Sequence, residues 1–127
     1  IFDELRDDAI PEELDKKVRD ILSKVDRKAR ILHRSGHGIG VTIHEEPYLS
    51  IGYNRPLKEG MVFSIEPGIY IKGFGGLGTR IPCCLKKDGY EVLTKFPTDI
   101  DELIVSGPPF SMKIKSRFIK AFLKKRK

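Results

Sequence analysis

The chain has 127 residues, of which 39% are hydrophobic and 33% charged, and this composition predicts one globular domain rather than a disordered segment. No apolar run reaches the roughly 18 residues that span a bilayer, and the acidic N-terminus is unlike the basic start of a signal peptide, so we expect a soluble, cytoplasmic protein. Ile1 is not an initiator methionine, which leaves open a processed chain, a truncated chain or a piece of a longer protein.

The formal net charge of +6 comes from one end of the chain. Residues 113–127 carry eight Lys and Arg and no acid, which leaves a charge of −2 for residues 1–112. A fold that binds nucleic acid spreads its Lys and Arg residues over the body of the domain. The positive net charge therefore bears only on what the tail binds. We favour a solvated basic helix docked on the domain by one face; the alternative is contact with an anionic membrane or with nucleic acid.

An amphipathic helix is predicted from Pro11 to about Lys28. Pro11 suits a first helical turn, and the acids that follow it are favourable at the positive end of the helix dipole. The apolar positions fall at helical spacing: Leu14, Val18, Ile21, Leu22 and Val25.

Strands are expected after the helix. The segments 31–33 and 41–43 have the pattern of strands interrupted by a bulge or tight turn at the intervening glycines. Residues 61–66 have the pattern of a buried strand that ends at Pro67-Gly68, and Ile69–Ile71 continues the extended pattern.

The pattern of the second half indicates a hairpin and then a separate helix. Residues 73–78 are interpreted as a glycine-rich connection, 77–85 as a further strand, and 90–94 as its hairpin partner across the turn at 87–89. Residues 99–105 form a short element of undetermined type.

Pro108-Pro109 is a breaker, and a very basic amphipathic helix follows it. The sequence therefore predicts an α+β fold with a first domain over 1–107 and a basic helical tail over 108–127.

All three histidines lie within twelve consecutive residues, at positions 33, 37 and 44. Histidine ligates metals and moves protons near neutral pH, so this crowding favours a site over ordinary surface histidines. His33 and His37 are four apart and project to one side, whereas His44 reaches that side only if a bulge intervenes. Glu66 ends an apolar strand, where a buried carboxylate needs a cation or hydrogen-bond donors; the alternative is a solvated strand end.

Several other patterns are weaker. Gly73–Gly78 satisfies G-x-G-x-x-G, but no helix can open at the following Thr79-Arg80-Ile81-Pro82, so we interpret it as a loop. His44-Glu45 begins like H-E-x-x-H and lacks the second histidine. The adjacent Cys83 and Cys84 imply no disulfide framework, which fits a reducing compartment, and their default role is as small apolar strand residues.

A larger set of motifs resembles a known family. These are His33-Arg-Ser-Gly-His-Gly-Ile-Gly40, His44-Glu-Glu-Pro-Tyr48, Glu59 to Tyr70 with its Ile-Glu-Pro-Gly, Gly78-Thr-Arg-Ile81, and Asp88-Gly-Tyr-Glu-Val-Leu-Thr-Lys-Phe-Pro97. Together they resemble, over about residues 9–105, the C-terminal half of the pita-bread (M24-type) metallopeptidases, and are most similar to Xaa-Pro dipeptidases (prolidases) and aminopeptidase P.

The resemblance implies residue roles. His37 and Glu66 match metal ligands of a dinuclear site that usually holds manganese, cobalt or zinc. His33 and His44 match histidines that contact the substrate and stabilise the transition state, and Arg80 matches an arginine near the active centre. The implied substrate is a peptide with proline at its second position, hydrolysed by a metal-activated water.

The departures from the family pattern are equally informative. The family takes two aspartate ligands from the preceding half of its domain, which this chain lacks. Its second glutamate ligand lies two residues after the arginine that matches Arg80, where this chain has Pro82. No residue from Ile81 to Lys87 is a carboxylate, and a cysteine as substitute ligand is the less favoured alternative because Cys83 and Cys84 face opposite ways on a strand.

Three functions follow as alternatives. The first is an Xaa-Pro dipeptidase-like hydrolase fragment that is inactive alone because metal ligands are missing. The family is enzymatic, but whether this chain is itself an enzyme stays open. The second is a non-catalytic peptide- or protein-binding module of the same fold, and the third is an interaction through the basic tail. Because the resembled fold has two similar halves, we expect a homodimer or a partner chain to supply the missing half.

Overall fold

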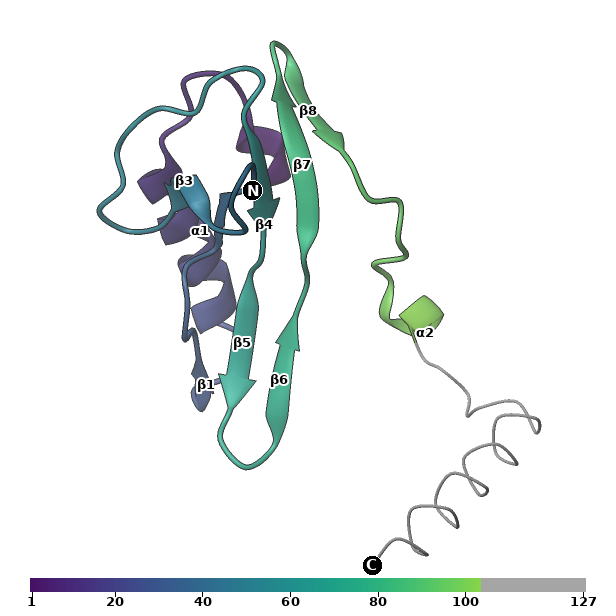
Figure 1. Ribbon diagram of the computed structural model, residues 1–127. Coiled ribbons are helices and arrows are strands. Elements are labelled where there is room, and N and C mark those ends of the chain that lie inside the picture. Colours follow the sequence, from purple (N-terminus) through teal and green to yellow (C-terminus); the bar gives the residue numbers. More distant parts are fainter. Residues whose placement is uncertain (104–127) are drawn as a thin grey trace, which may run out of the picture. The chain divides into compact units, whose positions relative to one another are not determined.

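The computed structural model describes residues 1–103 (Figure 1). The chain divides into a unit of residues 1–95 and a second unit that begins at Phe96, and each is described by itself. Among the described residues, no helix has the length and apolar character needed to cross a membrane. The elements are η1 Phe2–Glu4, α1 Pro11–Ser23, β1 Ala29–Arg30, β2 Gly36–Gly38, β3 Glu45–Leu49, β4 Val62–Ile65, β5 Gly68–Ile71, β6 Gly75–Gly78, β7 Ile81–Lys86, β8 Gly89–Val92 and α2 Ile100–Leu103.

The helix α1 confirms the predicted N-terminal helix but ends at Ser23 rather than near Lys28. The Asp26 side chain accepts a hydrogen bond from the Lys28 N–H at 2.6 Å, a local turn that competes with further helix. The predicted apolar stripe is accordingly too long: its first two positions are buried, whereas Ile21 is 52% and Val25 60% exposed.

The strands form two antiparallel sheets, one of order β1-β5-β6 and one of order β3-β2-β4-β7-β8. Figure 1 shows β4 leading into β5 and β6 leading into β7, so that two long strands run side by side through both sheets. A helix followed by antiparallel strands confirms the expected α+β class.

The two predicted strands at 31–33 and 41–43 are wrong. Neither segment pairs in a ladder, and the strands nearby are β1 and β3. Around Thr42 the backbone turns instead, because the Glu45 carboxylate accepts hydrogen bonds from the Thr42 N–H at 3.0 Å and from its hydroxyl at 3.1 Å. Val41 and Ile43 are therefore left exposed in a loop.

The glycine-rich segment 73–78 is the turn and second strand of a hairpin rather than a plain connection. Gly73 has a φ of +80°, which suits the turn, and Gly75–Gly78 pairs with β5 as strand β6. Gly76 lies against the ring of Tyr70, where an added Cβ would meet Cδ1 at 2.5 Å, so the strand needs a glycine at that position. The second predicted hairpin, β7 and β8 around Gly89, is confirmed.

The core lies on one face of the larger sheet. Phe63, Ile65, Cys83 and Leu85 are all buried there against Leu14 of α1. Because side chains alternate along a strand, the residues between them point to the other face, where the candidate site lies.

The C-terminal predictions lie mostly outside the described residues. Within residues 99–103, the short element of undetermined type is the helix α2. The basic tail helix over 108–127 falls beyond residue 103, so that helix and the domain boundary at 107/108 stay predictions.

Candidate metal and substrate site

The site is built on the central strands of the larger sheet. His37 of β2 lies opposite Ser64 of β4, and Ser64 in turn lies opposite Pro82 of β7. Gly36 and Gly38 flank His37 because the neighbouring backbone comes very close: an added Cβ would lie 2.2 Å from the carbonyl oxygen of Ser64 or of Glu46. This close packing leaves His37 only 4% exposed.

His37 and Glu66 face each other. Nε2 of His37 lies 3.2 Å from Oε1 of Glu66, and both atoms are buried without a hydrogen-bond partner among the described residues. The other ring nitrogen, Nδ1, is 2.9 Å from the carbonyl oxygen of Gly38, which only accepts, so Nδ1 carries a proton. In the neutral ring, Nε2 then points a lone pair at a carboxylate oxygen, an arrangement that calls for a proton or a cation between them.

Arg80 neutralises Glu66 from the other side. Its Nη2 donates to Oε2 at 3.0 Å, and its Nε forms an ion pair with Oε1 at 2.9 Å without the alignment of a hydrogen bond. Burial alone raises the pKa of Glu66, but the Ser64 hydroxyl, Arg80 and His37 outweigh it and hold that pKa below its ordinary value. Glu66 is therefore an anion at neutral pH.

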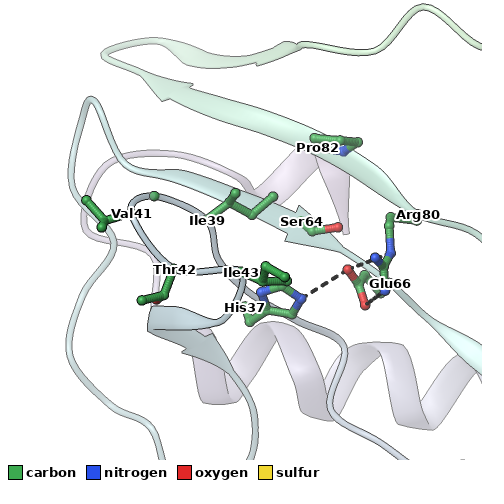
Figure 2. A pocket seen from close by; sticks show the side chains of 10 residues that line it. His37, Ile39, Val41, Thr42, Ile43, Ser64, Glu66, Arg80 and Pro82 are labelled. Carbon is green, nitrogen blue, oxygen red and sulfur yellow. Dashed lines mark hydrogen bonds and ion pairs between the residues drawn. The ribbon is translucent and has the colours of Figure 1, made fainter.

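A hollow of about 310 Å³ lies beside this pair (Figure 2). Its walls are mostly apolar and come from Ile39, Val41, Ile43 and Pro82, while His37, Ser64, Glu66 and Arg80 supply the polar groups. Apolar walls around a few convergent polar groups are typical of small-molecule and peptide sites.

The expected bulge exists, and the three histidines divide between two places. The register between β2 and β3 shifts between His37 and Gly38, and the His44 ring lies 4.1 Å from that of His37, measured between centroids. His33 instead lies 2.8 Å, through Nε2, from the hydroxyl of Tyr70. His33 lines a neighbouring hollow of about 260 Å³, which shares Glu66 and Arg80 with the first.

The side chains of His37 and Glu66 could supply part of a metal centre. Two atoms bound to one cation at 2.0–2.2 Å lie roughly 3 to 3.5 Å apart, which the 3.2 Å between His37 and Glu66 matches. Among residues 1–103, however, no cluster of three or more His, Cys, Asp and Glu side chains is suited to hold a metal ion. Pro82 lines the hollow, and neither Cys83 nor Cys84 does. His37 and Glu66 therefore fit two ligand positions, and the described residues alone do not complete a centre.

Three further residues of this region were not predicted from the sequence. Ser64 is a buried hydroxyl beside Glu66, and its sequence indication was a lone polar residue in an apolar run. Tyr70 pairs with His33, for which the sequence offered no indication. Asp15 is a buried carboxylate on α1, and its only sequence indication is an arginine four residues later.

The fold is shared with solved metallopeptidases of the Xaa-Pro class. Over 77% of its length the chain matches the structure of an X-Pro aminopeptidase from Thermotoga maritima with a TM-score of 0.71 and 32% identity, and over 72% it matches a prolidase from Pyrococcus furiosus with a TM-score of 0.67 and 36% identity. It covers 28% and 27% of those chains, so the expected partial pita-bread fold is confirmed.

Residues 1–82 match the model of metallopeptidase family M24, and the chain belongs to this family. It is 47% identical over 91 residues to the Xaa-Pro dipeptidase of Lactobacillus helveticus, covering 70% of this chain and 24% of that protein. It is 36% identical over 105 residues to the probable dipeptidase PepE of Mycobacterium bovis, covering 83% of this chain and 28% of that protein. The chain thus spans about a quarter of the length of these relatives.

Proposed function

We propose that this chain provides one wall of an Xaa-Pro dipeptidase-type metallohydrolase site. His37 and Glu66 are its metal ligands, and His33, His44 and Arg80 contact the peptide substrate. The observation that carries the proposal is the buried Nε2 of His37, which has no hydrogen-bond partner among the described residues and faces Oε1 of Glu66 at 3.2 Å beside an apolar hollow.

A divalent cation such as Mn²⁺, Co²⁺ or Zn²⁺ supplies, when bound, Lewis acidity and an acidified water. The chain's own residues prepare the surroundings. The exposed ring of His44 lies next to His37, within reach of a substrate in the hollow. The Arg80 side chain is 66% exposed, so it meets solvent or substrate while it holds Glu66.

Two ligands do not make an enzyme site, because catalytic metals in proteins use three or four. We infer that the remaining ligands come from another polypeptide segment, either a second copy in a homodimer or a partner chain. The chain by itself then hydrolyses Xaa-Pro dipeptides slowly or not at all.

Pro82 supports a second candidate, a non-catalytic peptide-binding module. Proline has no ligand atom in its side chain, yet it fills a position in the wall of the hollow opposite Ser64. In this case the apolar hollow holds a peptide without cleaving it. Contacts of the basic tail with nucleic acid or an anionic membrane would add to either function.

The two candidates are separated by an assay for Xaa-Pro dipeptide hydrolysis with added Mn²⁺ or Co²⁺, with a dipeptide that lacks proline as the control. Turnover that is lost in His37→Ala and Glu66→Gln supports the hydrolase. Dipeptide binding without turnover, measured by calorimetry, supports the binding module. Light scattering at micromolar concentration tests the homodimer, and a stable monomer rules it out.

A further inference from the structure

Asp15 is a fully buried carboxylate, at 0% exposure, in the N-terminal half of α1. Its Oδ1 accepts hydrogen bonds from the N–H of Ser35 at 3.0 Å and from the Ser35 hydroxyl at 2.5 Å. Its Oδ2 accepts from the N–H of Ile51 at 3.0 Å and from Nε of Arg19 at 2.8 Å. Four donors thus compensate for the burial of one charge, and hydrogen bonds to an ionised acceptor are the strong kind.

Three of the four donors come from the two ends of the β2–β3 hairpin, and the fourth, Arg19, lies on α1 itself. Ser35 lies directly before β2, and Ile51 follows β3. Arg19, held by Asp15, uses Nη2 to donate to the carbonyl oxygen of His33 at 3.1 Å. One side chain of the helix therefore holds the hairpin that carries the proposed site histidines.

The same contacts reach Glu66. The N–H of Glu66 donates to the carbonyl oxygen of Ser35 at 2.6 Å, and His37 lies two residues after Ser35. Ser35 is thus bonded on one side to Asp15 and on the other to the backbone of Glu66. A shift of Ser35 moves both residues that face each other at 3.2 Å.

We propose that Asp15 is a positioning residue for the site, which acts through Ser35 to set the approach of His37 to Glu66. The proposal rests on the proposed function where it concerns metal binding. A buried ion pair is a poor way to gain stability, because an apolar side chain of the same volume often serves as well or better. An apolar residue cannot direct the Ser35 and Ile51 amides or the Ser35 hydroxyl, which are the three groups of the hairpin ends that donate to Asp15.

The test compares Asp15→Asn with Asp20→Asn in the chain as it exists. Asp20 is an exposed aspartate on the same helix, so its variant repeats the chemical change away from the site. Two readouts are taken at a temperature where circular dichroism shows both variants folded. One is the set of imidazole ¹⁵N resonances of the three histidines at fixed pH; the other is the Mn²⁺ concentration that half-broadens the His37 resonances.

In Asp15→Asn we expect the His33 and His37 resonances to shift and Mn²⁺ binding to weaken about tenfold or more, the usual effect of removing an outer-shell partner. Asp20→Asn should match the wild type in both. A folded Asp15→Asn with wild-type histidine resonances overturns the proposal. If the wild type shows no Mn²⁺ broadening at His37, the metal function fails, while the histidine resonances still decide the role of Asp15.

If Asp15→Asn does not fold, Ser35→Ala replaces it. This variant removes only the hydroxyl donor to Asp15 and leaves the amide donor in place. It should move the same resonances in the same direction by a smaller amount, and unmoved resonances overturn the proposal.

Discussion

Nε2 of His37 and Oε1 of Glu66 lie 3.2 Å apart in a region where neither atom has a hydrogen-bond partner among the described residues. Unpaired buried polar atoms are costly, so native proteins keep few of them. Oε1 already forms an ion pair with Nε of Arg80 at 2.9 Å, so the uncompensated atom is Nε2 of His37, which a cation or proton shared with Oε1 would satisfy.

Replacing Pro82 by glutamate should restore a ligand. Pro82 lines the hollow with His37 and Glu66, so a carboxylate there adds a third donor to the two present. We expect Pro82→Glu to bind Mn²⁺ at least about tenfold more tightly than the wild type, measured by the loss of the free Mn²⁺ signal in electron paramagnetic resonance. Cys84→Glu, which places the same charge two residues along β7 and outside the hollow, is the matched control. Equal affinities of the two variants would contradict the prediction.

Replacing Gly36 by alanine should separate β2 from β4. The new Cβ would lie 2.2 Å from the carbonyl oxygen of Ser64, which is backbone and cannot turn away. We expect a loss of about 1–3 kcal/mol in the free energy of unfolding, measured by urea titration.

Gly60→Ala is the control for this substitution. Gly60 has open space around it but a φ of +85°, so its replacement reports backbone strain without a clash. We also expect Gly36→Ala, and not Gly60→Ala, to shift the His37 imidazole resonances. Equal effects of the two on those resonances would show that close strand packing does not hold His37.

Two phenylalanines test how the hydrophobic core is packed. Phe63 is 0% exposed at the centre of the core, whereas Phe74 is 88% exposed in the β5–β6 turn. Phe63→Ala should lower the free energy of unfolding by about 3–5 kcal/mol because it leaves a cavity. Phe74→Ala should change it by less than about 0.5 kcal/mol. Comparable losses in chemical denaturation would contradict the described packing of the core.

Cys83 should make the fold sensitive to alkali. Burial, with a smaller effect of Cys84, raises the pKa of Cys83 to about 12 from an ordinary value near 9. The unfolded chain therefore releases this proton at lower pH than the folded chain, so the stability that it contributes is complete below pH 9 and is lost as the pH rises toward 12.

The measurement is urea unfolding of the wild type and of Cys83→Ala at pH 7, 9 and 10. Lysines and tyrosines titrate in both proteins, so their effect cancels in the difference between the two free energies of unfolding. We expect the stability of the wild type to fall more steeply with pH than that of Cys83→Ala. Parallel pH profiles would show that the thiol is not buried in the folded state.

Much of the fold was predictable because its patterns are local. The α1 helix followed from spacing and its N-terminal proline, and the β7–β8 hairpin followed from the turn before Gly89. The strands predicted at 31–33 and 41–43 were wrong because a three-residue segment with two apolar side chains does not show whether a neighbouring strand is available to pair with it.

The candidate site was predictable by residue type and not by geometry. The crowding of histidines indicated chemistry, and the bulge after His37 brought His44 beside it as expected. That His33 pairs with Tyr70, and that Asp15 is buried under Ser35, depend on contacts between residues far apart in the chain. Spacing alone carries no information about such contacts.

Whether His37 and Glu66 are two ligands of an incomplete metal site is decided by a titration of the chain with Mn²⁺, followed by electron paramagnetic resonance. We expect one weak site, at least about tenfold weaker than that of Pro82→Glu, that disappears in both His37→Ala and Glu66→Gln. Binding that persists unchanged in these variants, or no binding to the wild type at all, would contradict it.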